Sequence, residues 1–485
     1  MLSKVEQGTI NGIYKDSIHK FLGIPYAAPP IKERRWTQPM PPQKWEGIYQ
    51  ATNFGPICPQ KGGASFNLRQ DKQSEDCLYL NVWTSTTICD AQQPVMVWIH
   101  GGGNLGGAGS EDAFDGTNLA KQGVTVVTFN YRLGAFGFIA HPDIGCNFAV
   151  LDQVAALEWI SNNIGSFGGN PNNITIFGES AGAQAVRNLL SVSRAKGLFH
   201  RAIIQSAGFE PYVFTSTHSY EKVQTSTEKL FEKLGTSDLE KLQKLPANDI
   251  LEASMAFSGT VPPPGEVHTP ANLIWNQVPD GEIIAKDGFP GCDVDLPILI
   301  GCVENEARYF IKPNGTYHNN DLSRMAQVLA TTKSDQALQL LNNKDLTTYE
   351  ALDLLFTTTI WFEPSYATVN KFVELGYDVY YYHFARVSPE HYRTKELAQH
   401  TSEIKYVFGN LQPEEHYDDR DRIISKQLQH AWITFGKKGV PQNEDGTSWA
   451  CYNRDEPYIN HIKDTVYSEP LKLNPLTEII HSLRK

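Results

Sequence analysis

The sequence predicts an α/β fold in which helices cover both faces of a mostly parallel β-sheet. Short runs of β-branched and aromatic residues recur along the chain and alternate with stretches whose apolar residues have helical spacing. A strand, a helix and a second strand in succession favour a parallel sheet. Polar and glycine-rich turns follow several of these strands directly, and ligand sites of such sheets lie beyond the carboxyl ends of the strands.

The segments with the composition of buried strands are residues 95–99, 124–129, 174–177, 202–204, 296–300 and 377–384. Residues 153–163 are expected to be helical, because Val154, Leu157, Ile160 and Ile164 recur every three or four positions. Residues 215–290 and 310–375 are less regular, and we expect them to be insertions that cap the sheet and shape a pocket. The whole chain, 1–485, is expected to form a single domain.

Composition and charge narrow the class of protein. The chain has 485 residues and a formal net charge of -12, which argues against nucleic acid or an anionic membrane as a partner. No apolar run approaches membrane-spanning length, and residues 1–8 do not resemble a signal peptide, so we expect a cytoplasmic protein. The seven cysteines form no CxxC pair, which argues against a zinc site or a disulfide framework.

The most informative motif is Gly-Glu-Ser-Ala-Gly at residues 178–182. It follows the strand at 174–177 and precedes a predicted helix at 183–190. A Gly-x-Ser-x-Gly between a strand and a helix is typical of a nucleophile elbow, in which glycines permit a sharp turn and the serine hydroxyl is exposed at the sheet edge. The motif therefore predicts that Ser180 attacks a carbonyl carbon.

A second glycine-rich turn follows the strand at 95–99. His100 is followed by three glycines at 101–103, and this pattern is typical of an oxyanion loop. The amides of Gly102 and Gly103, together with that of Ala181 after the nucleophile, are expected to hold a negatively charged oxygen. We expect His100 to orient the loop rather than to transfer protons.

The remaining members of a catalytic triad follow the nucleophile in the order acid and then histidine in this architecture. Glu304 and Glu306 both follow the strand at 296–300, and spacing alone does not separate them. The downstream histidines are His318, His383, His391, His400, His416, His430, His461 and His481. His400 lies in a predicted loop before an apolar segment at 406–409, but the pattern alone does not select it.

The sequence closely resembles the type-B carboxylesterase/lipase family, which includes the cholinesterases. The resemblance runs from about residue 20 to about residue 455 and rests on several separate motifs. They are residues 21–27 with Trp36, Ser-Glu-Asp-Cys-Leu-Tyr-Leu-Asn-Val at 74–82, Asn-Tyr-Arg-Leu-Gly at 130–134, and matching residues between 151 and 171. This resemblance implies the α/β-hydrolase fold and ester hydrolysis without a metal or an organic cofactor.

The resemblance also implies roles for single residues. The family's acid motif matches Glu306 and its histidine motif matches His400, although the glycines that often follow both residues are Ala307 and Thr401 here. Glu179 and Ser206 match polar residues that line the family's site, and we expect them to support catalysis.

Two further family features concern the segment between Cys58 and Cys77. Secreted members pair the equivalent cysteines, whereas we expect free thiols here in the absence of an export signal. Cholinesterases carry a tryptophan in this segment that binds a quaternary ammonium group, but its only aromatic residue here is Phe66. This difference argues against a choline ester as substrate.

We therefore expect a serine esterase that forms an acyl-enzyme on small to medium esters with short acyl or aryl groups. Its partner is a small-molecule ester, and the chain is expected to be a monomer or a small homo-oligomer without stable membrane association. A lipase acting on longer chains is one alternative, although no strongly amphipathic lid is evident. A non-catalytic scaffold of the same fold is another, but such proteins have typically lost a triad residue.

Overall fold

Strand β7 (Gln93–Ile99) lies between two parallel neighbours, β8 (Thr125–Phe129) and β9 (Gly169–Glu179). These strands belong to the first of two units into which the chain divides, formed by Met1–Ile203, Thr217–Pro264 and His268–Val294. The second unit comprises Ile204–Ser216, Gly265–Val267 and Asp295–Lys485. The computed structural model describes residues 2–61, 72–207, 219–260, 272–286, 296–311, 313 and 315–484.

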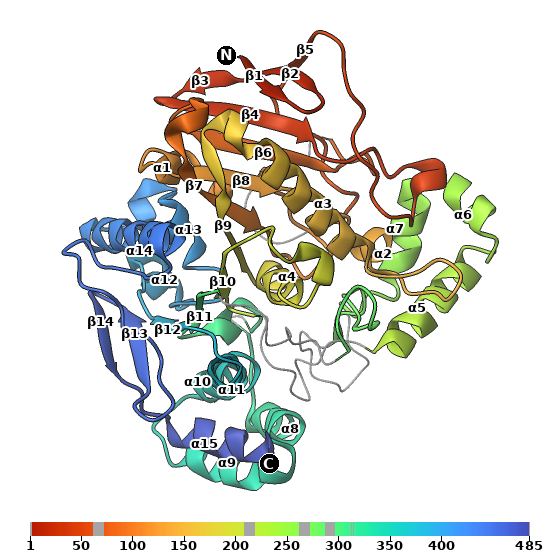
Figure 1. Cartoon of the computed structure of the whole chain (residues 1–485). Coiled ribbons are helices and arrows are strands. Elements are labelled where there is room, and N and C mark those ends of the chain that lie inside the picture. The colour runs from red at the N-terminus through yellow and green to blue at the C-terminus, as the bar shows by residue number, and fades with distance from the viewer. Residues whose placement is uncertain are drawn as a thin grey trace. The chain divides into compact units, whose positions relative to one another are not determined.

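The main sheet of the first unit has the strand order β9-β7-β8-β6-β4-β3 (Figure 1). Strands β6 (Tyr79–Thr84), β4 (Ile18–Pro25) and β3 (Ile13–Lys15) continue it in antiparallel fashion. A smaller sheet has the order β1-β2-β5 and is formed by Leu2–Val5, Gly8–Asn11 and Ile48–Gln50. All five residues of β8 are buried, as expected for a strand covered on both faces.

Helices α3 (Phe148–Asn163) and α4 (Ala181–Leu189) both pack against β9. Helix α4 follows β9 after one residue, so the nucleophile motif lies at this junction. The other α-helices in the described part of the first unit are α1 (Thr117–Ala120), α2 (Gly134–Phe138), α5 (Tyr220–Lys233), α6 (Leu239–Lys244) and α7 (Ala247–Met255). The last three fall in the predicted insertion 215–290.

The second unit contains the parallel strands β11 (Ile298–Val303), β12 (Val379–Phe384) and β13 (Tyr458–Ile462), in that order. Strand β14 (Val466–Pro470) pairs antiparallel with β13 at the edge. Strand β10 (Arg201–Gln205) carries the chain from the first unit into the second. The carboxyl end of β11 leads directly to the predicted catalytic acid, Glu306.

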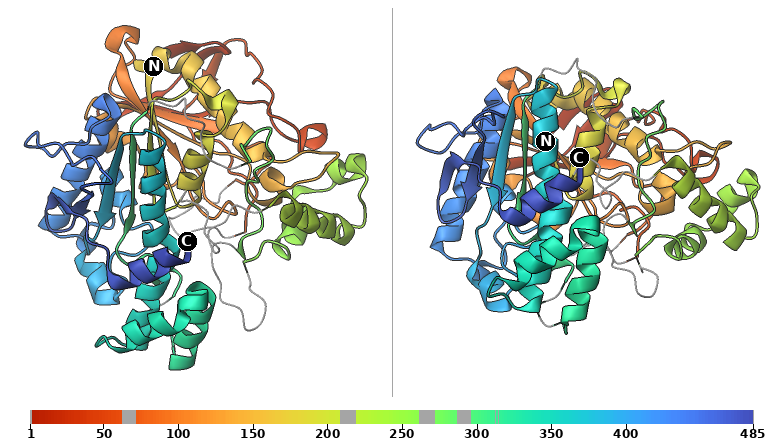
Figure 2. Two further views of the ribbon diagram at one scale, coloured as in Figure 1. Left: turned by 60° about the horizontal axis from the view of Figure 1, so that its bottom comes forward. Right: turned by 90° about the horizontal axis from the view of Figure 1, so that it is seen from below.

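The predicted insertion 310–375 is helical. Helices α8 (Asn319–Leu329) and α9 (Ser334–Asn342) lie beside each other, and α10 (Thr348–Thr357) packs against α8 (Figure 2). A π-helical turn (Thr358–Phe362) joins α10 directly to α11 (Glu363–Glu374). π-Helical turns inside α-helices occur frequently at functional sites. The remaining helices of this unit are α12 (Pro389–Thr394), α13 (Ile404–Phe408), α14 (Asp419–Lys438) and α15 (Pro475–His481).

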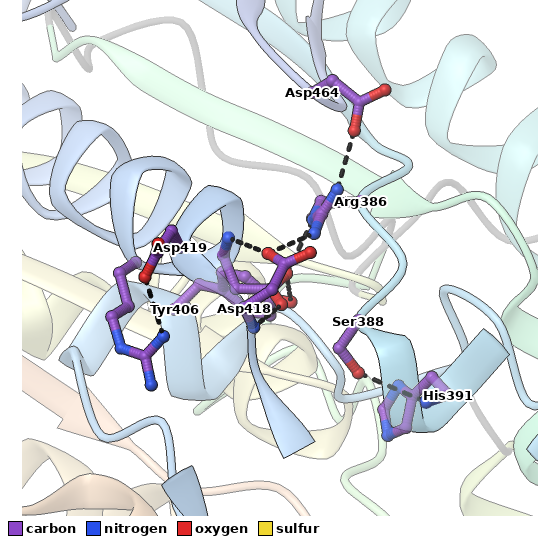
Figure 3. Close-up of polar contacts among 9 residues, drawn as sticks. Arg386, Ser388, His391, Tyr406, Asp418, Asp419 and Asp464 are labelled. Atoms are coloured by element: carbon purple, nitrogen blue, oxygen red, sulfur yellow. Dashed lines mark hydrogen bonds and ion pairs between the residues drawn. The ribbon is translucent and has the colours of Figure 1, made fainter. Parts of the chain in front are cut away.

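Arg386, which follows β12, is the centre of a cluster of ion pairs in the second unit (Figure 3). Its Nε atom donates to Asp421 at 2.6 Å, and its two terminal nitrogens donate to Asp418 at 2.8 Å and to Asp464 at 2.7 Å. Asp418 caps α14, and Asp464 lies in the turn between β13 and β14. The single guanidinium therefore connects the end of β12 to a helix and to a β-hairpin.

The predicted strands are all present, with boundaries that differ by a few residues. The helix predicted at 153–163 begins earlier, at Phe148, and β9 begins at Gly169, five residues before the predicted start at 174. Over the described ranges no helix is both long and apolar enough to span a membrane. Cys58 and Cys77 are buried free thiols, as expected, whereas Phe66 lies outside the described residues.

Candidate active site

Ser180 occupies a strained turn between β9 and α4. Its φ and ψ are 55° and -127°, a combination that side-chain-bearing residues rarely adopt. A Cβ on Gly182 would lie 2.0 Å from the carbonyl oxygen of Ile99, and a Cβ on Gly178 would lie 2.6 Å from the carbonyl carbon of Gly182. The turn therefore requires glycine on both sides of the serine, which explains the Gly-x-Ser-x-Gly pattern.

The glycine loop lies against this turn. A Cβ on Gly101 would lie 2.7 Å from the carbonyl oxygen of Glu179 and 3.1 Å from the Cβ of Ser180. Gly102 and Gly103 have φ values of 103° and 62°, in the region that favours glycine. Within the described parts of the chain, the amides of Gly102, Gly103 and Ala181 donate to no protein acceptor. Three backbone donors are thus left available near the nucleophile.

In the second unit, the structure brings two of the predicted residues together. The Nδ1 atom of His400 lies 2.5 Å from Oε2 of Glu306, and the other carboxylate oxygen accepts the Val303 amide at 3.0 Å. Glu306 is 0% exposed and His400 is 3% exposed. The amide of Asn305 donates to the Ala398 carbonyl at 2.9 Å, so the acid loop and the histidine loop are joined through their backbones. Glu304, the alternative acid, is exposed.

Aromatic rings surround the His400 imidazole. The ring centroids of Phe310, Trp361 and Tyr309 lie 5.4, 5.8 and 5.8 Å from that of His400. Phe310 stacks on Trp361 at 5.3 Å and is itself 39% exposed. Trp361 comes from the π-helical turn, and no sequence pattern pointed to it.

The acid loop is supported by helix α10, a contact that sequence reasoning missed. Buried Asp353 accepts hydrogen bonds from Asn305 at 2.8 Å and from Arg308 at 2.6 Å. The hydroxyl of Thr357 donates to Asp353 at 3.1 Å and accepts the Ala307 amide at 3.1 Å. The residues on both sides of Glu306 are therefore held by one helix. The spacing of Asp353 and Thr357, four residues apart on a helix face, is the only local signal that could have found this pair.

Thr401, which follows the histidine, has a φ of 75°. A β-branched residue is strongly disfavoured in this region, which favours glycine. The sequence difference from the family at this position is therefore accompanied by backbone strain next to His400.

Two further residues named from the sequence are buried. Glu179 is almost completely enclosed, and Ser206 has a φ of 58° and a fully buried side chain. The Ser206 amide donates to the Gly301 carbonyl at 2.9 Å, while its hydroxyl has no partner among the described residues. His100 stacks on Tyr131, and burial lowers its pKa to about 4, so its imidazole is neutral. A neutral, buried His100 agrees with a role in orienting the loop.

Comparisons with known proteins identify the family. The sequence model of the Carboxylesterase family matches residues 2–476. The chain is 33% identical to para-nitrobenzyl esterase of Bacillus subtilis (strain 168), with 96% of each protein covered, and 30% identical to fumonisin B1 esterase of Sphingopyxis macrogoltabida, with 94% of this chain and 85% of that protein covered.

Solved structures agree with this assignment. A PNB esterase superposes with a TM-score of 0.83 at 31% identity, and a carboxylesterase of Geobacillus stearothermophilus superposes with a TM-score of 0.82 at 30% identity. Each comparison covers 99% of both chains. The chain therefore belongs to the carboxylesterase family and has the α/β-hydrolase fold. It is a carboxylic ester hydrolase.

Proposed function

We propose that the enzyme hydrolyses esters through an acyl-enzyme on Ser180, with His400 as the general base and Glu306 as its carboxylate partner. Ser180 attacks the ester carbonyl while His400 takes the hydroxyl proton, and His400 then protonates the leaving alcohol. Water hydrolyses the acyl-enzyme in the second half of the cycle. The strained conformation of Ser180 beside unoccupied backbone donors is the observation that carries this proposal.

The amides of Gly102, Gly103 and Ala181 form the oxyanion hole in this proposal. Each is a fixed donor beside the nucleophile, and losing one such donor typically costs about 2.7–4 kcal/mol in the barrier. Glu179 and Ser206 support the site through their buried polar groups.

We propose short-acyl and aryl esters of small to medium size as substrates. The relatives include a para-nitrobenzyl esterase, and exposed Phe310 stacked on Trp361 offers an aromatic surface next to His400. Hydrolysis rates of p-nitrophenyl esters from acetate to palmitate test this choice. Rates that increase toward the longest chains would favour the lipase alternative instead.

The decisive experiment is active-site labelling. We expect an organophosphate to add one phosphoryl group per chain at Ser180, with loss of p-nitrophenyl acetate turnover in step with labelling. Ser180→Ala should abolish both, whereas Ser191→Ala, a serine beyond the end of α4, should leave both as in the wild-type protein. Full turnover by the Ser180→Ala variant would refute the proposal.

The cytoplasm is the proposed location, because every described cysteine is a free thiol and that compartment keeps thiols reduced. Fractionation of the producing cells tests the location. We propose a monomer or a small homo-oligomer, which light scattering distinguishes.

A further inference from the structure

Glu111 is a buried carboxyl group for which the catalytic scheme has no role. It lies between the glycine loop and a 3-10 turn at Asp112–Phe114, and its side chain is 4% exposed. Its Oε1 atom accepts the Ala108 amide at 3.1 Å, and its own amide donates to the Ala108 carbonyl at 3.3 Å. Its Oε2 atom is buried and has no hydrogen-bond partner among the described residues.

The groups that face Glu111 are negative or neutral. They are the carboxylates of Glu179 and Asp112 and the phenol of Tyr131. The Tyr131 hydroxyl donates to the His100 carbonyl at 2.8 Å, and the His100 ring stacked on Tyr131 is neutral. Over the described ranges Glu111 forms no ion pair with a lysine or an arginine. No cation therefore balances a negative charge on this side chain.

A buried carboxylate without a compensating cation is costly, and such a group takes up a proton instead. Burial is the largest effect here, and the charges of Glu179 and Asp112 add to it. Together they outweigh the hydrogen bond from Ala108 and raise the pKa of Glu111 to about 8.

We propose that Glu111 is a positioning residue that acts as a neutral carboxylic acid, holding the chain after the glycine loop beside the Ser180 elbow without placing a buried negative charge there. This inference rests on the proposed function, because the charge on Glu111 is expected to affect the rate only through the reaction at Ser180. Attack by Ser180 creates a negatively charged oxygen at the glycine loop, and an ionised carboxylate buried nearby would oppose it. Ionisation of Glu111 is therefore expected to inactivate the enzyme at alkaline pH.

The test is the pH dependence of kcat/KM for p-nitrophenyl acetate between pH 6 and pH 9.5, corrected with the Ser180→Ala protein as a blank. When Glu111 loses its proton with a pKa of about 8, its neutral fraction is roughly tenfold smaller at pH 9 than at pH 7. The wild-type value should fall about tenfold over this interval. The kcat/KM of Glu111→Gln, which cannot ionise, should fall less than about twofold, and the control Glu240→Gln, which changes an exposed glutamate of α6, should retain the tenfold fall. A Glu111→Gln protein with the wild-type decline, or a wild-type protein with none, would overturn the inference.

A second measurement covers the case in which Glu111→Gln does not fold. Infrared difference spectra of the wild-type protein between pH 7 and pH 9 should show the loss of one protonated carboxyl band, and Glu111→Asp should shift that band. Absence of such a band in the wild-type protein would refute a neutral Glu111. Failure of the proposed function has a different signature, since no turnover that depends on Ser180 would then be measured at any pH.

Discussion

The Nδ1 atom of His400 donates to Oε2 of Glu306 across 2.5 Å, and both side chains are excluded from solvent. A proton held on Nδ1 leaves the lone pair on Nε2, which is the tautomer that a general base needs. A second contact, from the Val303 amide, holds the carboxylate in its orientation.

Glu306→Gln should therefore reduce kcat by about 10³–10⁴-fold, because an amide can donate to the imidazole and select the wrong tautomer. Glu304→Gln, two residues away and exposed, is the matched control and should change kcat less than about twofold. Steady-state kinetics with p-nitrophenyl acetate measure both. Equal losses in the two variants would contradict the assignment of the acid.

Gly182→Ala should destabilise the protein and abolish esterase activity. Its Cβ would lie 2.0 Å from the Ile99 carbonyl oxygen, so the elbow would have to move. The expected loss in the free energy of unfolding is at least about 3 kcal/mol, as for other severe steric conflicts in a core. Gly165→Ala is the control, since nothing lies within 4 Å of a Cβ there, and it should remain within about 1 kcal/mol of the wild-type protein. Urea denaturation measures both variants.

Thr401→Gly should stabilise the protein. The φ of 75° is strained for threonine, at a cost of order 1–3 kcal/mol, and glycine adopts it freely. The greater freedom of glycine in the unfolded chain offsets about 0.5–1 kcal/mol of this gain, so we expect a net increase of about 1 kcal/mol in the free energy of unfolding.

The matched control for this prediction is Ser402→Gly, one residue further along the same loop. The backbone of Ser402 has no positive φ, and its hydroxyl donates to the Gln399 carbonyl at 2.6 Å. Glycine therefore relieves no strain there and should lower the stability. Thermal denaturation measures both variants, and a melting temperature of Thr401→Gly below that of the wild-type protein would contradict the prediction.

Arg386→Met should lower the free energy of unfolding by about 3–5 kcal/mol, because it leaves buried Asp421 without its cation. Arg393, which pairs with Glu390 on the surface of α12, provides the comparison. Arg393→Met should cost no more than about 1 kcal/mol, as for other exposed pairs. Similar losses in the free energy of unfolding for the two variants would contradict the prediction that the Arg386 ion pairs contribute more to stability than an exposed pair.

Glu111 also predicts how stability depends on pH. Its pKa is raised by burial to about 8, from an ordinary value of 4.5. Between these two values the native protein binds more protons at this position than the unfolded chain does, so the free energy of unfolding decreases as pH rises. The decrease ends above about pH 8, and its upper limit is about 5 kcal/mol.

Glu111→Gln should remove this contribution, so that its stability relative to the wild-type protein increases from pH 5 to pH 8. Guanidinium denaturation at several pH values measures the difference. A constant difference across this range would contradict the raised pKa.

The local features of the fold could be predicted from the sequence more readily than its long-range contacts. The buried strands are short runs of β-branched and aromatic residues, and the elbow is specified within residues 178–182. Helix α3 begins at Phe148, earlier than predicted; the preceding Asn147 makes no side-chain capping bond, and the first four helical residues are all apolar and buried. No polar face marks that start, and Asn147 alone did not identify it.

The choice between Glu304 and Glu306 depends on which carboxylate turns inward after β11, and two residues of the same type give no local signal for it. The support from Asp353 and the burial of Glu111 depend on contacts between segments that are distant in the sequence. The contact between Asp353 and Arg308 spans 45 residues, and no periodic pattern encodes it. Such features become visible only when the chain is folded.

The π-helical turn at Thr358–Phe362 has a consequence for helix α11. One extra residue in a helical turn rotates everything downstream by roughly 100° about the helix axis. Glu363, the first residue of α11, thereby faces inward, where it is fully buried and accepts hydrogen bonds from His481 at 2.7 Å and from Arg484 at 2.6 Å. Deleting one residue from the turn would rotate Glu363 away from both partners. The rotation of α11 about its own axis therefore determines where the end of α15 is held.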